Sequence, residues 1–514
     1  MKIHQYIIIL LSLMMAVSCS KDEGNYDYHP INELNIQGVN SEYVLRTGID
    51  TLRIQPKIAA SMDEADTSRY TYLWIIKLAA FSFDTIGRKK DLVYPVKLNA
   101  VPYDMFYRVI DKKTGVTWIA NSKLNISTPY SKGILIIGED DEGYAETEML
   151  SMLKDTVYFK NLLSKSGLPR LRDPVSFVHT GGSENFIKLW VFTKSGSYFL
   201  DRATLAGKEA NNFSRTLYVS ENIHPDGLQA VVLAPQITTA AGAIGSGLYR
   251  AMVTKGGDVF AGLPLFMGGD YFNNPINRLA TAQDVRIPAA PYLFYPINAM
   301  NSIMWYDTQN NRFLNYTGIG SAVASTLLPD QAGDVFSWNQ PAGRTLVYAE
   351  NTRNTDGGST AGNSFAIMKD ANNAHHIYKF YANGTNPAKR GYYAVKSIAT
   401  DFDKANFYAF SSNRSVVFYT VGNRLYAYDY NPGFEKIYTF SETHGDDISM
   451  IKFDTQIDFA TNSLYIATYN SATKGALSRY KVGTNPNVVD LQLQPKSTWT
   501  GMVKIKDINW RAVN

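Results

Sequence analysis

Apolar and polar residues alternate at every second position along much of the chain, which is the pattern of a β-strand with one buried face. Residues 51–58 alternate in this way. From Tyr70 to Ile76 the same period places Tyr70, Tyr72, Trp74 and Ile76 on one face. A tryptophan in this setting is typical of the core of a β-sandwich. The pattern predicts an all-β fold.

A hairpin signal and a change of pattern divide the chain into two predicted regions. Residues 107–111 and 116–120 are strand-like and flank the polar turn 112–115, which predicts a hairpin. We therefore expect a β-sandwich over residues 31–130, and its strands around Trp74 and Tyr107 resemble those of an immunoglobulin-type domain. From residue 131 to residue 514, short strands separated by polar turns recur.

These recurring units predict a β-propeller. The clearest examples are an apolar strand at 133–138 and the strand–turn–strand units at 188–201, 301–316, 424–438 and 463–480. Each unit is too small to bury its own faces, and repeats spaced by several tens of residues are typical of propeller blades. Blade centres near 135, 190, 250, 305, 346, 425 and 465 predict about seven blades, with six or eight also allowed. Stacked sandwiches are the alternative, which the near-uniform units and the lack of a Pro-rich linker disfavour.

Two segments depart from the strand pattern. Apolar residues at helical spacing, Met149, Leu150, Leu153 and Val157, predict a helical insertion over residues 146–166. The segment 351–363 is rich in Asn, Thr and Gly, and we expect a long loop there.

The beginning of the chain reads as a lipoprotein signal. The apolar run from Tyr6 to Val17 is shorter than the roughly 20 residues that cross a bilayer and fits an export signal. It ends at Cys19, the only cysteine of the chain. We expect residues 1–18 to be removed and Cys19 to be lipidated, which anchors the protein to a membrane. A chance apolar start with a buried cysteine, or a plain secretory signal cut elsewhere, remains open.

Residues 19–30 are polar and predict an extended tether. Within it, Lys21, Asp22 and Glu23 directly follow Cys19. This triplet resembles the surface-export signal of Bacteroidota lipoproteins, which implies the outer face of the outer membrane. A generic charged spacer is the alternative.

Composition and charge exclude several classes of protein. With 50 Lys and Arg against 46 Asp and Glu, the formal net charge is +4, and no basic block indicates a nucleic-acid partner. A single cysteine leaves no disulfide and no thiolate metal site. The 34 Tyr and 37 Gly are typical of an exported all-β protein with many turns.

Motifs for catalysis are absent from the sequence. There is no zinc-protease, serine-hydrolase or P-loop signature, and the glycines Gly242, Gly245 and Gly247 lack the strand-then-helix setting of a dinucleotide site. His375 and His376 are adjacent and would point to opposite faces of a strand. The acidic turns 140–142 and 446–447 lack the regular ligand spacing of a Ca²⁺ site. The sequence therefore predicts no catalytic residue, metal or cofactor.

Binding is the remaining expectation, because loops on a rigid scaffold usually carry function. Turn residues suited to stacking on a sugar or contacting a peptide are Tyr430, Asn431, Asn310, Asn311 and Trp338. Most such aromatic side chains fill the core of a propeller, so the ligand-binding residues stay unassigned.

The first 130 residues or so resemble a known family. Cys19, residues 25–28 and 31–33, the strand around Trp74 and the strand beginning at Tyr107 resemble the PKD-like lipoproteins of Bacteroidota. The resemblance implies an accessory surface lipoprotein associated with SusC/SusD-type importers, which helps to capture peptides or glycans without catalysis. The alternatives are a surface hydrolase with unrecognised acids in the propeller funnel, and a purely structural scaffold.

Overall fold

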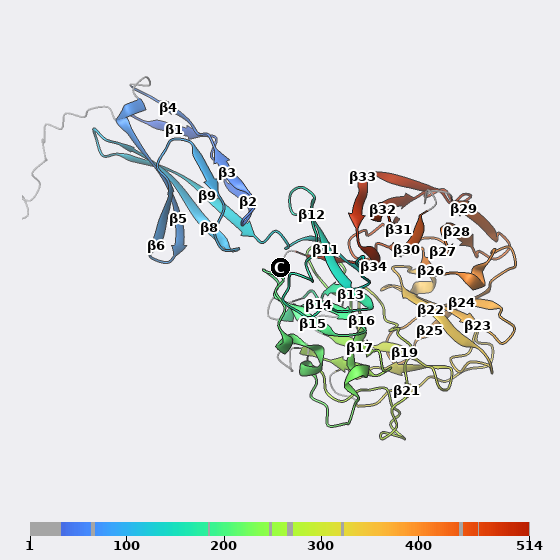
Figure 1. Ribbon diagram of the computed structural model, residues 1–514. Coiled ribbons are helices and arrows are strands. Elements are labelled where there is room, and N and C mark those ends of the chain that lie inside the picture. The colour runs from blue at the N-terminus through green and yellow to red at the C-terminus, as the bar shows by residue number, and fades with distance from the viewer. Residues whose placement is uncertain are drawn as a thin grey trace, which may run out of the picture. The chain divides into compact units, whose positions relative to one another are not determined.

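The computed structural model describes residues 32–512, except 63–66, 183–185, 246–248, 265–270, 320–322, 441–445 and 461. The predicted signal peptide, Cys19, Lys21, Asp22, Glu23 and the tether lie outside the described residues. The chain forms two compact units, one ending at Ile126 and one beginning at Ser127 (Figure 1).

The N-terminal unit is a β-sandwich. A five-stranded sheet has the order β2-β9-β8-β5-β6, and two further strand pairs, β1-β4 and β3-β7, complete it. The strands are β1 (Leu34–Gln37), β2 (Glu42–Arg46), β3 (Thr51–Ile54), β4 (Lys57–Ala60), β5 (Tyr70–Ala79), β6 (Ser82–Gly87), β7 (Leu92–Pro95), β8 (Pro102–Asp111) and β9 (Thr117–Ser127).

The predicted core of this sandwich is confirmed. Trp74 and Tyr107 are fully buried, and their rings stack with centroids 4.0 Å apart. The prediction of one strand over residues 51–58 is wrong, because β3 ends at Ile54 and β4 begins at Lys57. Pro56 lies at this break and has no N–H to donate to a continuous ladder.

The second unit is the predicted β-propeller, and its described residues form seven sheets. We number the sheets as blades 1 to 7, with the orders β34-β10-β11-β12, β13-β14-β15, β16-β17-β18, β19-β20-β21, β22-β23-β24-β25, β26-β27-β28-β29 and β30-β31-β32-β33. The strands of blades 1 to 3 are β34 (Lys504–Arg511), β10 (Gly133–Glu139), β11 (Ala145–Ser151), β12 (Val157–Phe159), β13 (Pro174–His179), β14 (Leu189–Thr193), β15 (Ser197–Leu200), β16 (Ala230–Ala234), β17 (Arg250–Thr254) and β18 (Val259–Gly262).

The strands of blades 4 to 7 follow in chain order. They are β19 (Ile303–Asp307), β20 (Arg312–Tyr316), β21 (Thr326–Leu327), β22 (Thr345–Asn351), β23 (Ser364–Lys369), β24 (His375–Tyr381), β25 (Ala388–Ala394), β26 (Phe407–Phe410), β27 (Val416–Val421), β28 (Arg424–Asp429), β29 (Lys436–Phe440), β30 (Asp447–Phe453), β31 (Ser463–Asn470), β32 (Lys474–Val482) and β33 (Leu491–Met502). In blade 4, the segment at Phe294 adds a bridge to Met304 of β19.

Strands far apart in the sequence close the ring of blades. β34, near the end of the described chain, pairs antiparallel with β10, the first strand of the propeller. Blade 1 is therefore built from both ends of the unit, which fastens the ring.

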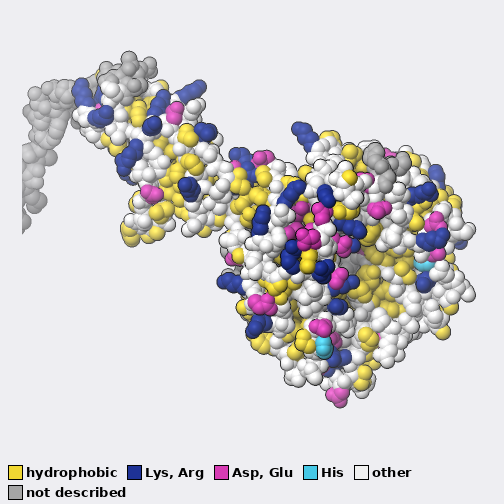
Figure 2. All heavy atoms as spheres, viewed as in Figure 1, with side chains coloured by type: hydrophobic (Ala, Val, Ile, Leu, Met, Phe, Trp, Pro, Cys, Tyr) yellow, Lys and Arg dark blue, Asp and Glu magenta, His cyan; other side chains and the backbone are white. Residues whose placement is uncertain are grey.

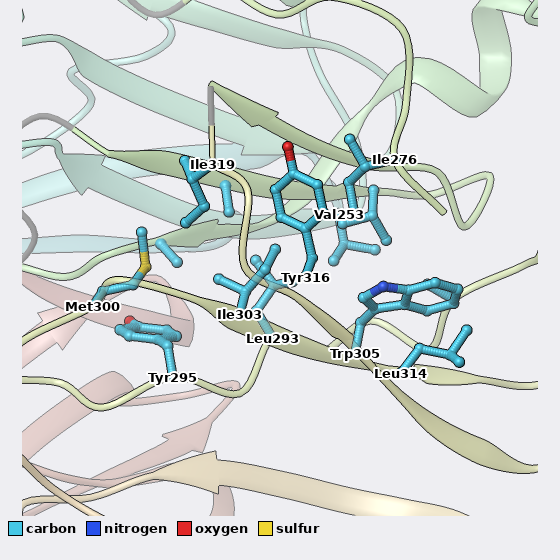
Figure 3. Packing of buried hydrophobic residues seen from close by; sticks show 14 of the residues in the cluster. Val253, Ile276, Leu293, Tyr295, Met300, Ile303, Trp305, Leu314, Tyr316 and Ile319 are labelled. Atoms are coloured by element: carbon cyan, nitrogen blue, oxygen red, sulfur yellow. The ribbon is translucent and has the colours of Figure 1, made fainter. Parts of the chain in front are cut away.

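Hydrophobic clusters join each blade to the next, including blade 7 to blade 1. Figure 3 shows the cluster between blades 3 and 4, where Val253 of β17 packs in the same core as Trp305 of β19 and Leu314 of β20. Because both faces of most strands meet a neighbouring blade, residues on both faces are apolar.

This two-sided burial explains why the helical prediction for residues 146–166 is wrong. The segment forms β11 and β12. Met149 packs toward blade 2 and Leu150 toward blade 7. Consecutive apolar residues that serve opposite faces mimic helical spacing. The predicted loop over 351–363 is confirmed between β22 and β23.

Helices are short throughout the described residues. They are the 3-10 turns η1 (Thr67–Arg69), η3 (Glu209–Asn211), η4 (Phe213–Thr216), η5 (Pro225–Leu228), η6 (Asp356–Gly358) and η7 (Phe402–Lys404). None of the helices in the described part of the chain has the length and apolar character to span a membrane.

Candidate functional site

A polar groove of about 400 Å³ lies between the turns of blades 6 and 7. Its residues come from the turns that follow β26, β28, β30 and β32. The residues lining this polar groove are Asn413, Arg414, Ser415, Asp429, Asn431, Asn462, Gly483, Thr484 and Pro486. Equivalent turns of two neighbouring blades thus form its two walls.

Carboxylates fix the backbone of these turns. Asp429 accepts a hydrogen bond from the backbone N of Asn431 at 3.0 Å. Asp458 accepts from the backbone N of Asn462 at 3.2 Å and of Ser463 at 2.8 Å. Such bonds, donated by backbone N–H groups to the carboxylate of a preceding Asp, stabilise tight turns. The groove is therefore built on ordered turns.

Arg414 stabilises the wall of the groove that is formed by the segment after β32. Its guanidinium donates to the carbonyl oxygens of Val488 at 2.8 Å, Pro486 at 3.1 Å and Gly483 at 3.4 Å. Burial raises the pKa of Asp429, and the positive charge of Arg414 opposes this shift. The negative charge of Asp429 and the positive charge of Arg414 therefore offset each other within the groove.

The remaining polar groups are mainly amides. Asn413 donates to the side-chain oxygen of Asn462 at 3.0 Å, which links the two walls. The side chain of Asn431 makes no hydrogen bond to another described residue. Phe434, in the same turn as Asn431, is 75% exposed. Amides donate and accept at once, so this groove fits a neutral ligand rich in hydroxyl or amide groups.

A second polar set lies along the propeller axis. The first strands of blades 5, 6, 7, 1 and 2 lie side by side in that order. Lys452 of β30 donates to Asp507 of β34 at 2.8 Å and to the carbonyl oxygen of Ile508 at 2.7 Å. Asn509 donates to Asp507 at 2.7 Å and to Ser176 of β13 at 2.9 Å.

Glu350 of β22 faces this axial network. Its carboxylate accepts from the backbone N of Phe410 at 2.8 Å and from the Tyr348 hydroxyl at 3.2 Å. Burial raises the pKa of Glu350 to about 7, although these hydrogen bonds and the charge of Lys452 lower it. Asp507, by contrast, is ion-paired with Lys452. A metal would need a third ligand, and the described residues contain no group of three or more His, Cys, Asp or Glu that could hold one.

The predicted binding residues lie in different parts of the structure. Asn431 lines the polar groove. Tyr430 and Trp338 are each only 3% exposed and belong to the hydrophobic clusters between blades, so they cannot stack on a ligand. Asn310 and Asn311 lie in the turn between β19 and β20, away from the groove residues in sequence and blade, where Asn310 donates to Asp307 at 2.8 Å.

The other candidates have structural roles. His375 packs on Phe402, whereas His376 contacts Asp370 at 3.0 Å and the Tyr392 hydroxyl at 2.8 Å, so the two imidazoles point apart as expected.

The acidic turns and the glycine-rich segment also have local partners. Asp140 is paired with Arg170, Asp141 with Lys474, and Asp446 accepts from Asn470 at 3.1 Å. Among the three glycines, Gly242 and Gly245 are described, and their segment leads from β16 into the strand β17.

Asn413, Arg414 and Asn462 were missed by the sequence reasoning. One signal could have found them, because polar residues including Asn follow the first strand of both blade 6 and blade 7, at 411–415 and 460–462. Recurrence of Asn at equivalent turns of neighbouring repeats marks a shared surface.

Comparisons with known proteins give one family match. The model of the PKD-like family matches residues 19–166. This range includes the sandwich and the first strands of the propeller. No match was found among the curated proteins.

Solved structures of low similarity cover most of the chain. A quinonprotein alcohol dehydrogenase-like protein from Bacteroides thetaiotaomicron is 13% identical, with a TM-score of 0.36 over 92% of this chain and 97% of that chain. The extracellular domain of a putative one component system from the same species is 9% identical, with a TM-score of 0.37 over 82% of this chain and 51% of that chain. A putative 6-phosphogluconolactonase from Bacteroides fragilis is 8% identical, with a TM-score of 0.29 over 87% of this chain and 99% of that chain.

Proposed function

We propose that this protein is a lipid-anchored surface protein of the outer membrane that binds a neutral glycan in the polar groove and performs no bond chemistry. In this proposal Cys19 carries the lipid, and Lys21, Asp22 and Glu23 direct the protein to the cell surface. It serves a SusC/SusD-type importer as an accessory component.

The composition of the polar groove carries the proposal. Asn413, Asn431 and Asn462 bring three amides to one surface, with Asp429 and Arg414 beside them. Sugar hydroxyls donate and accept hydrogen bonds, and amide side chains match both roles without a net charge. A peptide would instead require an exposed strand edge or a set of apolar side-chain pockets.

The small formal net charge of +4 supports a neutral ligand. Figure 2 shows acidic and basic side chains interspersed over the propeller face in view, without a broad patch of one sign. Exposed charges are screened within about 8 Å at physiological ionic strength. Binding through amides should therefore depend weakly on salt.

Binding of neutral polysaccharides by the purified mature protein tests this proposal. We expect N431A and N462A each to weaken the affinity about fivefold to tenfold, because each removes one hydrogen bond of roughly 1 kcal/mol. N372A is the matched control, since Asn372 is an exposed asparagine in the turn between β23 and β24. Equal affinity of all three variants would exclude the groove as the binding site.

A second candidate function rests on Glu350. A carboxyl group with a pKa of about 7 can act as a general acid near neutral pH, which suits hydrolysis. Incubation of the protein with peptide and polysaccharide mixtures separates the two functions. Turnover that disappears in E350Q would establish a hydrolase and contradict non-catalytic binding.

A further inference from the structure

Three arginines converge where strands of blades 1, 2 and 3 end. Arg511 is the last residue of β34, Arg202 is the second residue after β15, and Arg250 is the first residue of β17. His179, the last residue of β13, lies within electrostatic range of all three. Four chain segments thus bring their basic side chains to one place.

Three of the four members of this cluster are deeply buried. Arg511 is 3% exposed, Arg250 is fully buried and His179 is 2% exposed. Arg250 donates to the carbonyl oxygens of Gly181 and Tyr249, both at 3.0 Å. Arg511 donates through Nη2 to the carbonyl oxygen of Arg202, which places the Arg511 guanidinium beside the Arg202 backbone. Burying a guanidinium costs several kcal/mol unless it is paired.

Several donors in this cluster have no hydrogen-bond partner among the described residues. Nε and Nη1 of Arg511 and Nη1 of Arg202 are buried and make no hydrogen bond to any described residue. Nδ1 of His179 is likewise buried without a partner among the described residues. Buried polar atoms are normally satisfied, and an unsatisfied charged donor is strongly destabilising. The unpaired donors therefore indicate a missing acceptor.

No acidic group among the described residues supplies that acceptor. Asp201 is the carboxylate that acts electrostatically on Arg511, and it is solvent-exposed. Its Oδ1 already accepts from the backbone N of Ala203 and from Thr204. Burial and the three arginines lower the pKa of His179, so its imidazole is neutral at pH 7 and can donate through Nδ1.

We propose that Arg202, Arg511 and His179 form a buried binding site for a small oxyanion such as phosphate or sulfate, with the positive charge of Arg250 nearby. Guanidinium groups bind such anions through paired, charge-assisted hydrogen bonds. The burial of Arg511 and His179 restricts the ligand to a free, compact ion and excludes a polymer. Because β34 closes the ring, the bound anion joins the closing strand to blade 2.

Thermal unfolding of the mature protein in potassium phosphate or sulfate, against potassium chloride at equal ionic strength, tests the site. A ligand that binds the folded state raises Tm with the logarithm of its concentration. We expect this rise for phosphate and sulfate in the wild type. Equilibrium dialysis with radiolabelled phosphate or sulfate should give one ion per chain.

Variants connect the effect to the cluster. R511M and R202M should each weaken anion affinity by about tenfold or more, since each removes a charge-assisted contact. R424M is the control, because Arg424 is exposed at the start of β28. If R511M does not fold, R202M alone tests the proposal, because Arg202 is only half-buried and its replacement should disturb folding less. Stabilisation equal to that in chloride, or unchanged affinity in R202M, would overturn the proposal.

Discussion

Ile134 of β10 and Trp510 of β34 lie opposite each other in the antiparallel ladder that joins the two ends of the propeller. Both side chains belong to the hydrophobic cluster between blades 7 and 1. The backbone N of Trp510 also donates to Gln456 of blade 7 at 2.8 Å. Ring closure therefore depends on backbone pairing, apolar packing and a side-chain hydrogen bond at one point.

The close approach of these two strands predicts that G138V is destabilising. A Cβ at Gly138 would lie 2.4 Å from the carbonyl oxygen of Lys504 and 2.7 Å from the Val503 side chain. Overpacking of this kind costs about 1–3 kcal/mol. Urea unfolding of the propeller measures the loss. G227V is the control, because Gly227 lacks a positive φ and a Cβ added there would have no contact shorter than 3.5 Å. An equal loss in both variants would contradict this account of the closure.

Two carboxyl groups with raised pKa values predict that stability falls as pH rises from about 4.5 to about 7. Burial raises the pKa of both Glu148 and Glu350 from 4.5 to about 7. A carboxyl group whose pKa is higher in the folded than in the unfolded state favours folding when protonated. Its contribution is complete below the unfolded pKa and is lost as pH rises through the folded pKa.

The variant E148Q tests this dependence. It should be more stable than the wild type at pH 8 by on the order of 2 kcal/mol, and the difference should vanish near pH 4. The neutral amide keeps an acceptor for the backbone N of Val503, which lies 3.2 Å from Glu148. E142Q is the control, because the Glu142 side chain is 69% exposed. A stability difference that stays constant across this range would refute the raised pKa of Glu148.

The fold was largely predictable because its strands carry local signals. The Trp74 strand, the hairpin after Tyr107 and the blade units at 188–201 and 424–438 alternate or end in polar turns, and all form strands. The prediction for the segment 146–166 failed because burial on both faces removes the alternation.

The candidate site was much less predictable, because its residues meet only after the blades pack. Asn413 and Asn462 are separated along the chain and become neighbours only when blades 6 and 7 lie side by side. Tyr430 looked like a surface aromatic next to a turn, yet it packs between blades 5 and 6. In a propeller, an aromatic residue beside a turn can lie on the surface or pack between blades. The residues next to it in the sequence are similar in both cases.

Arg353 connects several blades, and R353M should therefore lower the free energy of unfolding. Its guanidinium donates to Thr455 at 2.7 Å, Thr238 at 2.9 Å and Asn298 at 3.0 Å, which belong to the loops of blades 7, 3 and 4. Arg353 itself follows β22 of blade 5.

We expect a loss of about 2–4 kcal/mol for R353M, because charge-assisted hydrogen bonds are stronger than neutral ones. R353K should lie between R353M and the wild type, since one ammonium cannot reach all three acceptors. Urea unfolding measures both, with R424M as the exposed control. A loss for R353M no greater than that for R424M would show that the Arg353 contacts contribute little.

The anchor proposed at Cys19 is open to a direct test in the native organism. C19A should abolish labelling by a fatty-acid analogue, because no other cysteine can take the lipid. Replacing Lys21, Asp22 and Glu23 by alanine should leave lipidation intact but protect the protein from protease added to whole cells. The two variants therefore separate attachment from export. Label on C19A would contradict lipidation at Cys19, and a wild type cleaved only after lysis would place the protein on the periplasmic side, out of reach of an extracellular glycan.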